Sequence, residues 1–201
     1  MTKLSLLAAV GCAALLAGCA STKAPPPTSF DFGPAVAPVT ATPAAAAFPA
    51  LVVAPVAGPA TLDSDRMFYR LMYENAQQSR PYAYNRWAAT PLELLSQRLK
   101  ARIAQGGVKV LSTTDATGGL PVLRLDTDEF SQNFDTASQS SASISLRASL
   151  FRNHQLVDQR TFTRSTPARS ADAAGGAGAL AATTDAIAAD ILAWLATQPP
   201  R

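Results

Sequence analysis

One alternating segment constrains the fold more than any other feature of the sequence. Apolar residues stand at Ile144, Leu146, Ala148 and Leu150, with Ser or Arg between them. Successive side chains of a β-strand point to opposite faces, so this pattern predicts a strand with one buried and one solvated side. Such strands are typical of antiparallel sheets, which can face water on one side. The chain is therefore expected to form a sheet whose apolar face is covered by other elements, while its polar face meets water.

Further strands are predicted on both sides of this segment. Asn153-His154 is expected to form a turn, and Leu156–Arg164 would return as the partner strand of a hairpin. The other β-rich runs are Phe30–Pro34, Leu51–Val53, Met67–Glu74, Pro81–Trp87, Val108–Leu111 and Val122–Phe134. Several connections are too short for parallel crossovers, which favours antiparallel pairing.

The clearest helix start is Thr90-Pro91-Leu92-Glu93. Thr90 can cap the helix, Pro91 suits its first position, and Glu93 completes a capping box. Its apolar face at helical spacing comprises Leu92, Leu95, Leu99 and Ile103, whereas Gln97, Arg98, Lys100 and Arg102 fill the other positions. Gly106-Gly107 is expected to end this helix.

A second helix is predicted from Asp172 to about Thr197, before Pro199-Pro200. Its apolar face comprises Leu180, Ile187, Ile191, Trp194 and Leu195. The order of strands, helix, strands and helix predicts an α+β fold: a single, mostly antiparallel sheet with two helices packed on one face.

The first nineteen residues have the form of a bacterial lipoprotein signal. Lys3 precedes an uncharged apolar run, Leu4–Ala17, which is too short to span ~30 Å of hydrocarbon as a helix. Leu16-Ala17-Gly18-Cys19 then resembles a lipobox, whose cysteine is acylated and becomes the first residue of the mature chain. The alternatives are an ordinary signal peptide that contains a cysteine, or an uncleaved anchor.

The lipobox interpretation divides the chain into three parts. We predict a signal peptide at residues 1–18, lipidated Cys19 with a flexible tether at 19–29, and a folded domain at 30–201. Residues 35–49 are rich in Ala, Pro and Thr and are expected to form an exposed loop. Cys12 would leave with the signal peptide, so the mature chain has no second thiol for a disulfide or a thiolate metal site.

The sequence contains little that points to catalysis. It has one histidine, His154, and none of the common nucleophile, zinc or phosphate-loop motifs. Asp126, Asp128 and Glu129 could hold a divalent cation or form an acid/base pair, but a solvated strand face is the simpler interpretation. No block of five Lys or Arg occurs, which argues against nucleic-acid binding. We expect no catalytic residue, metal or cofactor.

Aromatic residues gather before the first helix. Six of them fall within twenty positions: Phe68, Tyr69, Tyr73, Tyr82, Tyr84 and Trp87. Protein interfaces favour Tyr, Trp and Arg at their buried centres. Tyr82, Tyr84, Arg86 and Trp87 are therefore candidate partner-contact residues. The alternative, strongest for Phe68 and Trp87, is that these side chains fill the core beneath the helix.

The order of these segments resembles the ABC-type transport auxiliary lipoproteins, which include the paraquat-inducible lipoprotein components. The matching pieces are the lipobox, Phe30–Pro34, Leu51–Val53, Leu62–Ser64, Met67–Tyr73, Tyr82–Ala88, Val122–Phe130, Ile144–Leu150, Gln159–Phe162 and Asp172–Leu195. Tyr82-Ala83-Tyr84-Asn85-Arg86-Trp87-Ala88 is the most specific of them.

The resemblance implies a non-catalytic lipoprotein on the periplasmic face of the outer membrane. Such proteins are expected to engage an MCE-domain protein of an ABC transport system that moves phospholipids or other hydrophobic molecules. We also expect a homo-oligomer. Ala20, rather than Asp, after Cys19 leans towards the outer membrane. The alternative is a periplasmic lipid-binding carrier without a stable MCE partner, whose pocket would lie between the sheet and the helices.

Overall fold

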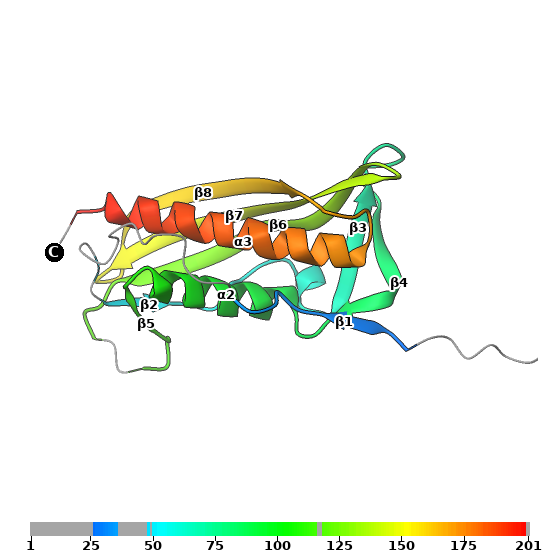
Figure 1. Cartoon of the computed structure of the whole chain (residues 1–201). Helices are drawn as coiled ribbons and strands as arrows, with labels where there is room; N and C mark the ends of the chain where they lie inside the picture. The colour runs from blue at the N-terminus through cyan, green and yellow to red at the C-terminus, as the bar shows by residue number, and fades with distance from the viewer. Residues whose placement is uncertain (1–25, 36–47, 49, 116–117, 200–201) are drawn as a thin grey trace, which may run out of the picture.

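The computed structural model describes residues 26–35, 48, 50–115 and 118–199. The predicted signal peptide, Cys19 and most of the 19–29 tether lie outside these residues, as do residues 36–47 of the expected loop. Eight strands form one sheet, and two helices, α2 (Pro91–Gln105) and α3 (Ala173–Ala196), pack on it (Figure 1). The α+β prediction is confirmed.

The longest ladders are antiparallel, as predicted. Strand β6 (Val122–Thr136) pairs with β7 (Gln139–Arg152) along its whole length, and β7 pairs with β8 (Gln155–Pro167). Asn153 and His154 form the β7–β8 turn with φ values of 50° and 65°. Two successive residues with positive φ are typical of a type I′ hairpin turn. The four alternating apolar residues of β7 are fully buried: Ile144, Leu146, Ala148 and Leu150.

The other edge of β6 is shared by two strands that run parallel to it. Strand β2 (Ala50–Val53) pairs with its beginning, and β3 (Arg66–Leu71) pairs with its end. Strand β5 (Lys109–Leu111) lies beside β2 in parallel, and β4 (Ser79–Trp87) is antiparallel to β3. A single-turn 3-10 helix, η2 (Ala60–Leu62), precedes β3. The sheet is thus mixed, with short parallel pairings that were not predicted from the sequence.

The first strand lies earlier in the chain than predicted. Strand β1 covers Thr28–Phe30, parallel to the end of β4, instead of Phe30–Pro34. Beyond it the chain leaves the sheet, and Gly33 adopts a left-handed conformation with φ +63°. Phe32 is buried against Trp87, with ring centroids 5.9 Å apart. The alternation in Phe30–Pro34 therefore comes from Phe32, which is buried in the core just after β1 ends, and not from a strand.

Both helix starts are confirmed in atomic detail. The Thr90 hydroxyl accepts a hydrogen bond from the Glu93 amide at 3.3 Å, and the Glu93 carboxylate accepts one from the Thr90 amide at 3.1 Å. The Asp172 carboxylate caps α3 by accepting from the Gly175 amide at 2.7 Å. All five residues predicted for the apolar face of α3 are buried. By length and hydropathy α3 could cross a membrane, but 56% of its most apolar window is buried, as in a core helix.

A buried amide holds the start of α3 against the sheet. Gln132 of β6 is 1% exposed. Its side-chain nitrogen donates to the Ser140 hydroxyl at 2.9 Å and to the Asp172 carbonyl at 3.0 Å. Its side-chain oxygen accepts from the Tyr82 hydroxyl at 2.9 Å. Gly176 of α3 lies so close to this amide that a Cβ atom there would overlap it.

Gly176→Ala should therefore destabilise the domain. Moving Gln132 aside would break three hydrogen bonds, one buried and two partly buried, so we expect a net loss of about 2 kcal/mol in the free energy of unfolding. Gly178→Ala is the matched control on the same helix, because a Cβ atom added there would meet nothing within 4 Å. It should gain about 0.5–1 kcal/mol from helix propensity. Urea unfolding of both variants checks this, and equal effects would contradict the packing described.

Candidate interaction surface

A bulge in β4 separates the four predicted contact residues. Arg66 pairs with Arg86, but Phe68 pairs with Pro81, so β4 holds extra residues opposite a short piece of β3. The bulge breaks the regular alternation of side chains between the two faces. Tyr82 and Tyr84, two positions apart, consequently differ: Tyr82 is half-buried, whereas Tyr84 is 50% exposed.

Tyr82 and Trp87 belong to the interior. The Tyr82 ring lies 4.6 Å from that of Tyr69, and its hydroxyl donates to Gln132. Burial, with Tyr69 and Asp172 close by, raises the pKa of Tyr82, so the hydroxyl remains a neutral donor. Trp87 is 4% exposed and packs edge-on to Phe32 and Phe130. These two residues hold β4 in place.

Tyr84 and Arg86 face solvent on the same strand. Arg86 is exposed and forms a 3.5 Å ion pair with exposed Asp65. We call Tyr84 and Arg86 the β4 surface. It combines a large amphipathic ring with a guanidinium, the side chains enriched at the centres of protein interfaces. Of the predicted contact residues, these two are accessible to a partner.

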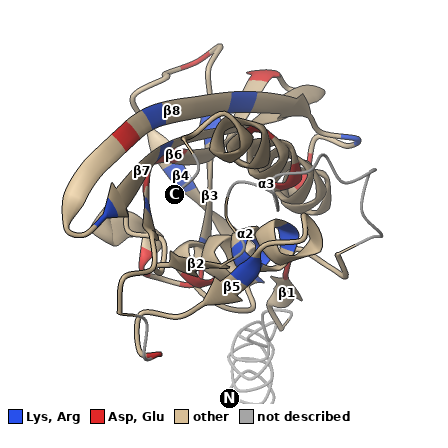
Figure 2. Ribbon diagram, turned by 90° about the vertical axis from the view of Figure 1, so that its left-hand side faces the viewer, with Lys and Arg blue, Asp and Glu red and all other residues tan. Residues whose placement is uncertain are grey.

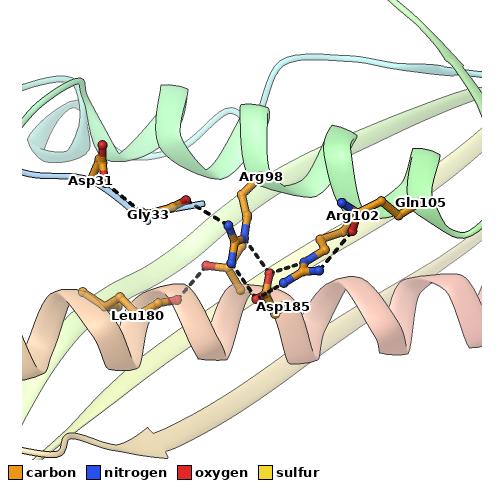
Figure 3. Close-up of polar contacts among 8 residues, drawn as sticks. Asp31, Gly33, Arg98, Arg102, Gln105, Leu180 and Asp185 are labelled. Atoms are coloured by element: carbon orange, nitrogen blue, oxygen red, sulfur yellow. Dashed lines mark hydrogen bonds and ion pairs between the residues drawn. The ribbon is translucent and has the colours of Figure 1, made fainter. Parts of the chain in front are cut away.

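A second polar site, which was not predicted from the sequence, joins the two helices (Figure 3). Arg98 and Arg102, one turn apart on α2, each donate two hydrogen bonds to Asp185 of α3, at 2.6 and 2.7 Å for Arg98 and at 2.7 and 2.5 Å for Arg102. Arg98 also donates to the Gly33 carbonyl at 3.2 Å. The cluster thereby ties the segment after β1 to both helices.

Burial and charge pairing act against each other in this cluster. Arg98 and Arg102 are 8% and 14% exposed, and Asp185 is 26% exposed. Burial alone would raise the pKa of the Asp185 carboxyl, but the hydrogen bonds from Arg102 and Arg98 outweigh it and hold the pKa below its usual value. In the sequence, Arg98 stands among the polar positions of the helix. Arg98 and Arg102 are four positions apart, so they lie on one face of the helix, and this spacing was the only hint in the sequence that they share a partner.

The remaining candidate chemistry does not assemble into a site. A bulge in β6 follows Thr127, and the Glu129 carboxylate accepts from Ser131 at 2.9 Å. Asp126 lies opposite Arg147 in the ladder. Among the described residues, no three His, Cys, Asp or Glu side chains are grouped to hold a metal. His154 is exposed in its turn. Figure 2 shows both acidic and basic residues along β8.

The sequence matches a known protein family over most of its length. Residues 30–192 match the profile of the ABC-type transport auxiliary lipoprotein component. The chain belongs to this family. Membership indicates a membrane-anchored, envelope-associated lipoprotein that has a transporter as its partner. No curated protein matches the chain.

Solved structures support the fold. Protein XCC0632 from Xanthomonas campestris, assigned to family DUF330, superposes with a TM-score of 0.70 at 23% identity, over 84% of this chain and 95% of its own. An uncharacterized protein superposes with a TM-score of 0.67 at 18% identity, over 85% of this chain and 99% of its own. At these identities the likeness concerns the architecture alone.

The Asp185 cluster predicts a specific pH dependence. Asp185→Asn leaves two largely buried guanidinium groups without a counter-charge and should cost about 2–3 kcal/mol at neutral pH. The folded pKa of Asp185 is lowered, so its contribution is complete above the unfolded value of about 4 and is lost as pH falls through the folded value. The stability difference between wild type and variant should therefore shrink in acid.

Asp190→Asn is the matched control for this measurement. Asp190 also makes a bidentate pair, with Arg164 at 2.6 and 2.7 Å, but that arginine is 53% exposed. Removing an exposed pair should cost about 0–1 kcal/mol. Urea unfolding of wild type and both variants from neutral pH into acid provides the comparison. A difference for Asp185→Asn that is small, or that does not change with pH, would contradict the account.

Proposed function

We propose that this chain is the non-catalytic, lipid-anchored component of an MCE-type ABC transport system, acting on the periplasmic face of the outer membrane. The system would move phospholipids or other hydrophobic molecules between the membranes. The observation that carries the proposal is the family match across residues 30–192. The lipobox at Cys19 supplies the anchor in this scheme, and the tether that follows gives the domain its reach.

The packing beneath the sheet supports docking over the alternative of a lipid carrier. Among the described residues, the cavity bordered by Met67 of β3, Trp87 of β4 and Leu180 of α3 measures about 10 Å³, which is about the space of one water molecule. Hollows of about 370 Å³ between β8 and α3 and about 530 Å³ beside the β7–β8 turn reach the size of small-molecule sites, but charged side chains line both, which does not suit an acyl chain. Large apolar side chains are fully buried on each layer, including Leu95 of α2 and Ile191 of α3. A role exercised through the surface fits this packing better.

The β4 surface is the contact that we assign to the MCE partner. Tyr84 and Arg86 are exposed, and they stand on a strand fixed from behind by Tyr82 and Trp87. A rigid, exposed aromatic lowers the entropic cost of binding. We further propose that the chain acts as a homo-oligomer. In the described part of the chain β8 pairs only with β7, which leaves the other edge of β8 outside any ladder.

Truncating the β4 surface should release the partner. Full-length wild type, Tyr84→Ala and Arg86→Ala are purified from native membranes in mild detergent, and co-purifying MCE-domain protein is quantified by mass spectrometry. Each variant should retain about a tenth or less of the wild-type amount, because central interface residues dominate affinity. Leu156→Ala is the control, since Leu156 is 54% exposed but lies on β8.

The outcomes separate the two parts of the proposal. Wild-type recovery of the MCE-domain protein in both β4 variants would remove these residues as the contact. Absence of any MCE-domain protein from the wild-type preparation would instead count against the transport assignment. Tyr84→Phe keeps the ring and should bind better than Tyr84→Ala if ring contact is the main contribution.

A further inference from the structure

The turn between β3 and β4 holds two neighbouring apolar side chains in water. Met72 is 42% exposed and Tyr73 is 53% exposed. They are the first two residues of the β3–β4 turn, which projects from one end of the sheet (Figure 1). We call Met72 and Tyr73 the hairpin tip. Neither side chain contributes to the core, so their exposure needs another explanation.

The turn is well ordered in spite of this exposure. The amides of Glu74 and Asn75 both donate to the Leu71 carbonyl, at 3.0 and 2.9 Å. Arg70 donates to the Ala76 carbonyl at 3.1 Å. The amide of Met72 donates to the Phe134 carbonyl of β6 at 2.9 Å, which extends the sheet into the turn. The tip is therefore presented by a fixed backbone.

The polar groups around the tip are largely satisfied within the hairpin. Arg80 donates to the Gln78 side chain at 2.9 and 2.7 Å and pairs with Glu74 at 2.9 Å. One negative and one positive side chain thus neutralise each other beside the tip. Removing water from paired, hydrogen-bonded groups costs less than from isolated ones. The tip can consequently approach an apolar environment at modest cost.

The tip lies at the end of the molecule to which β1 belongs, although β4 separates the two. Strand β1 begins at Thr28, which pairs with Asn85 near the end of β4, whereas the β3–β4 turn joins β4 at Ser79; Figure 1 shows both at the end of the sheet that β3 and β4 form. Thr28 stands nine residues after Cys19 in the sequence. Nine extended residues reach about 30 Å. A lipid on Cys19 would hold this end within reach of the membrane.

From these observations we propose that the hairpin tip rests in the lipid–water interface, as a second, non-covalent membrane contact beside the acyl anchor. The inference depends on the anchoring part of the proposed function, but not on the MCE partner. Tyrosine favours the interfacial region, where its ring is apolar and its hydroxyl stays hydrated. The contact is shallow, because exposed Asp135 follows Phe134 at the adjacent end of β6. The acyl anchor and the hairpin tip together would fix the orientation of the domain on the membrane, which a flexible tether alone leaves free.

Site-specific fluorescence tests the contact. Full-length lipoprotein carrying Tyr73→Cys or Leu156→Cys is labelled with an environment-sensitive dye and reconstituted in phosphatidylethanolamine–phosphatidylglycerol vesicles. Leu156, 54% exposed on β8, is the matched control. The dye at position 73 should be quenched by nitroxide-bearing lipid and be several-fold less accessible to aqueous iodide than the dye at position 156. No partner protein is present, so the result is independent of the MCE assignment.

Three results would overturn the inference. Equal iodide access at both positions would place the tip in water. Iodide protection together with nitroxide quenching at both positions would show that the domain does not meet the membrane by this end alone. Protection at position 73 from iodide without quenching by nitroxide lipid would show that protein, such as a second copy of the chain, covers the tip. Failure of the protein to remain with vesicles at all would instead count against the lipid anchor.

Discussion

The pairing of β6 sets the arrangement of the whole domain. One edge is taken by β7 along its full length, and the other is divided between β2 at its beginning and β3 at its end. The bulge after Thr127 shifts the buried set from odd positions, such as Leu125, to even positions, such as Gln132. A strand without the bulge would turn Gln132 away from α3. The hydrogen bonds from Gln132 to the Asp172 carbonyl and from Tyr82 to Gln132 depend on that shift.

Local signals in the sequence were enough to predict much of this fold. The capping box at Thr90, the alternation in β7 and the apolar face of α3 each depend on neighbouring residues, and the structure confirms them. The bulges in β4 and β6 depend on distant partners, and so do the parallel pairings of β2 and β3. The burial of Arg98 escaped prediction for the same reason, since its counter-charge lies 87 positions away in the sequence.

The structure also separates the aromatic residues by role. Tyr82 and Trp87 face inward as the β4 bulge allows, and Tyr84 and Arg86 are left outside. Polar contacts hold α3 along its length. Gln132 of β6 bonds to its start, and Arg98 of α2 pairs with Asp185 near its middle. Near its end, the Trp194 indole donates to Asp158 of β8 at 2.8 Å. A rigid body of this kind suits a component that positions a partner contact at a fixed distance from a membrane.

The central claim is that this domain works through its surface and encloses no lipid. Native mass spectrometry of the full mature lipoprotein after detergent exchange tests it most directly. We expect a mass equal to the chain from Cys19 plus its covalent acyl groups, with no phospholipid retained. A stoichiometric, non-covalently bound phospholipid that survives the exchange would contradict the account, because it would require the packed interior between the sheet and α3 to open around an acyl chain.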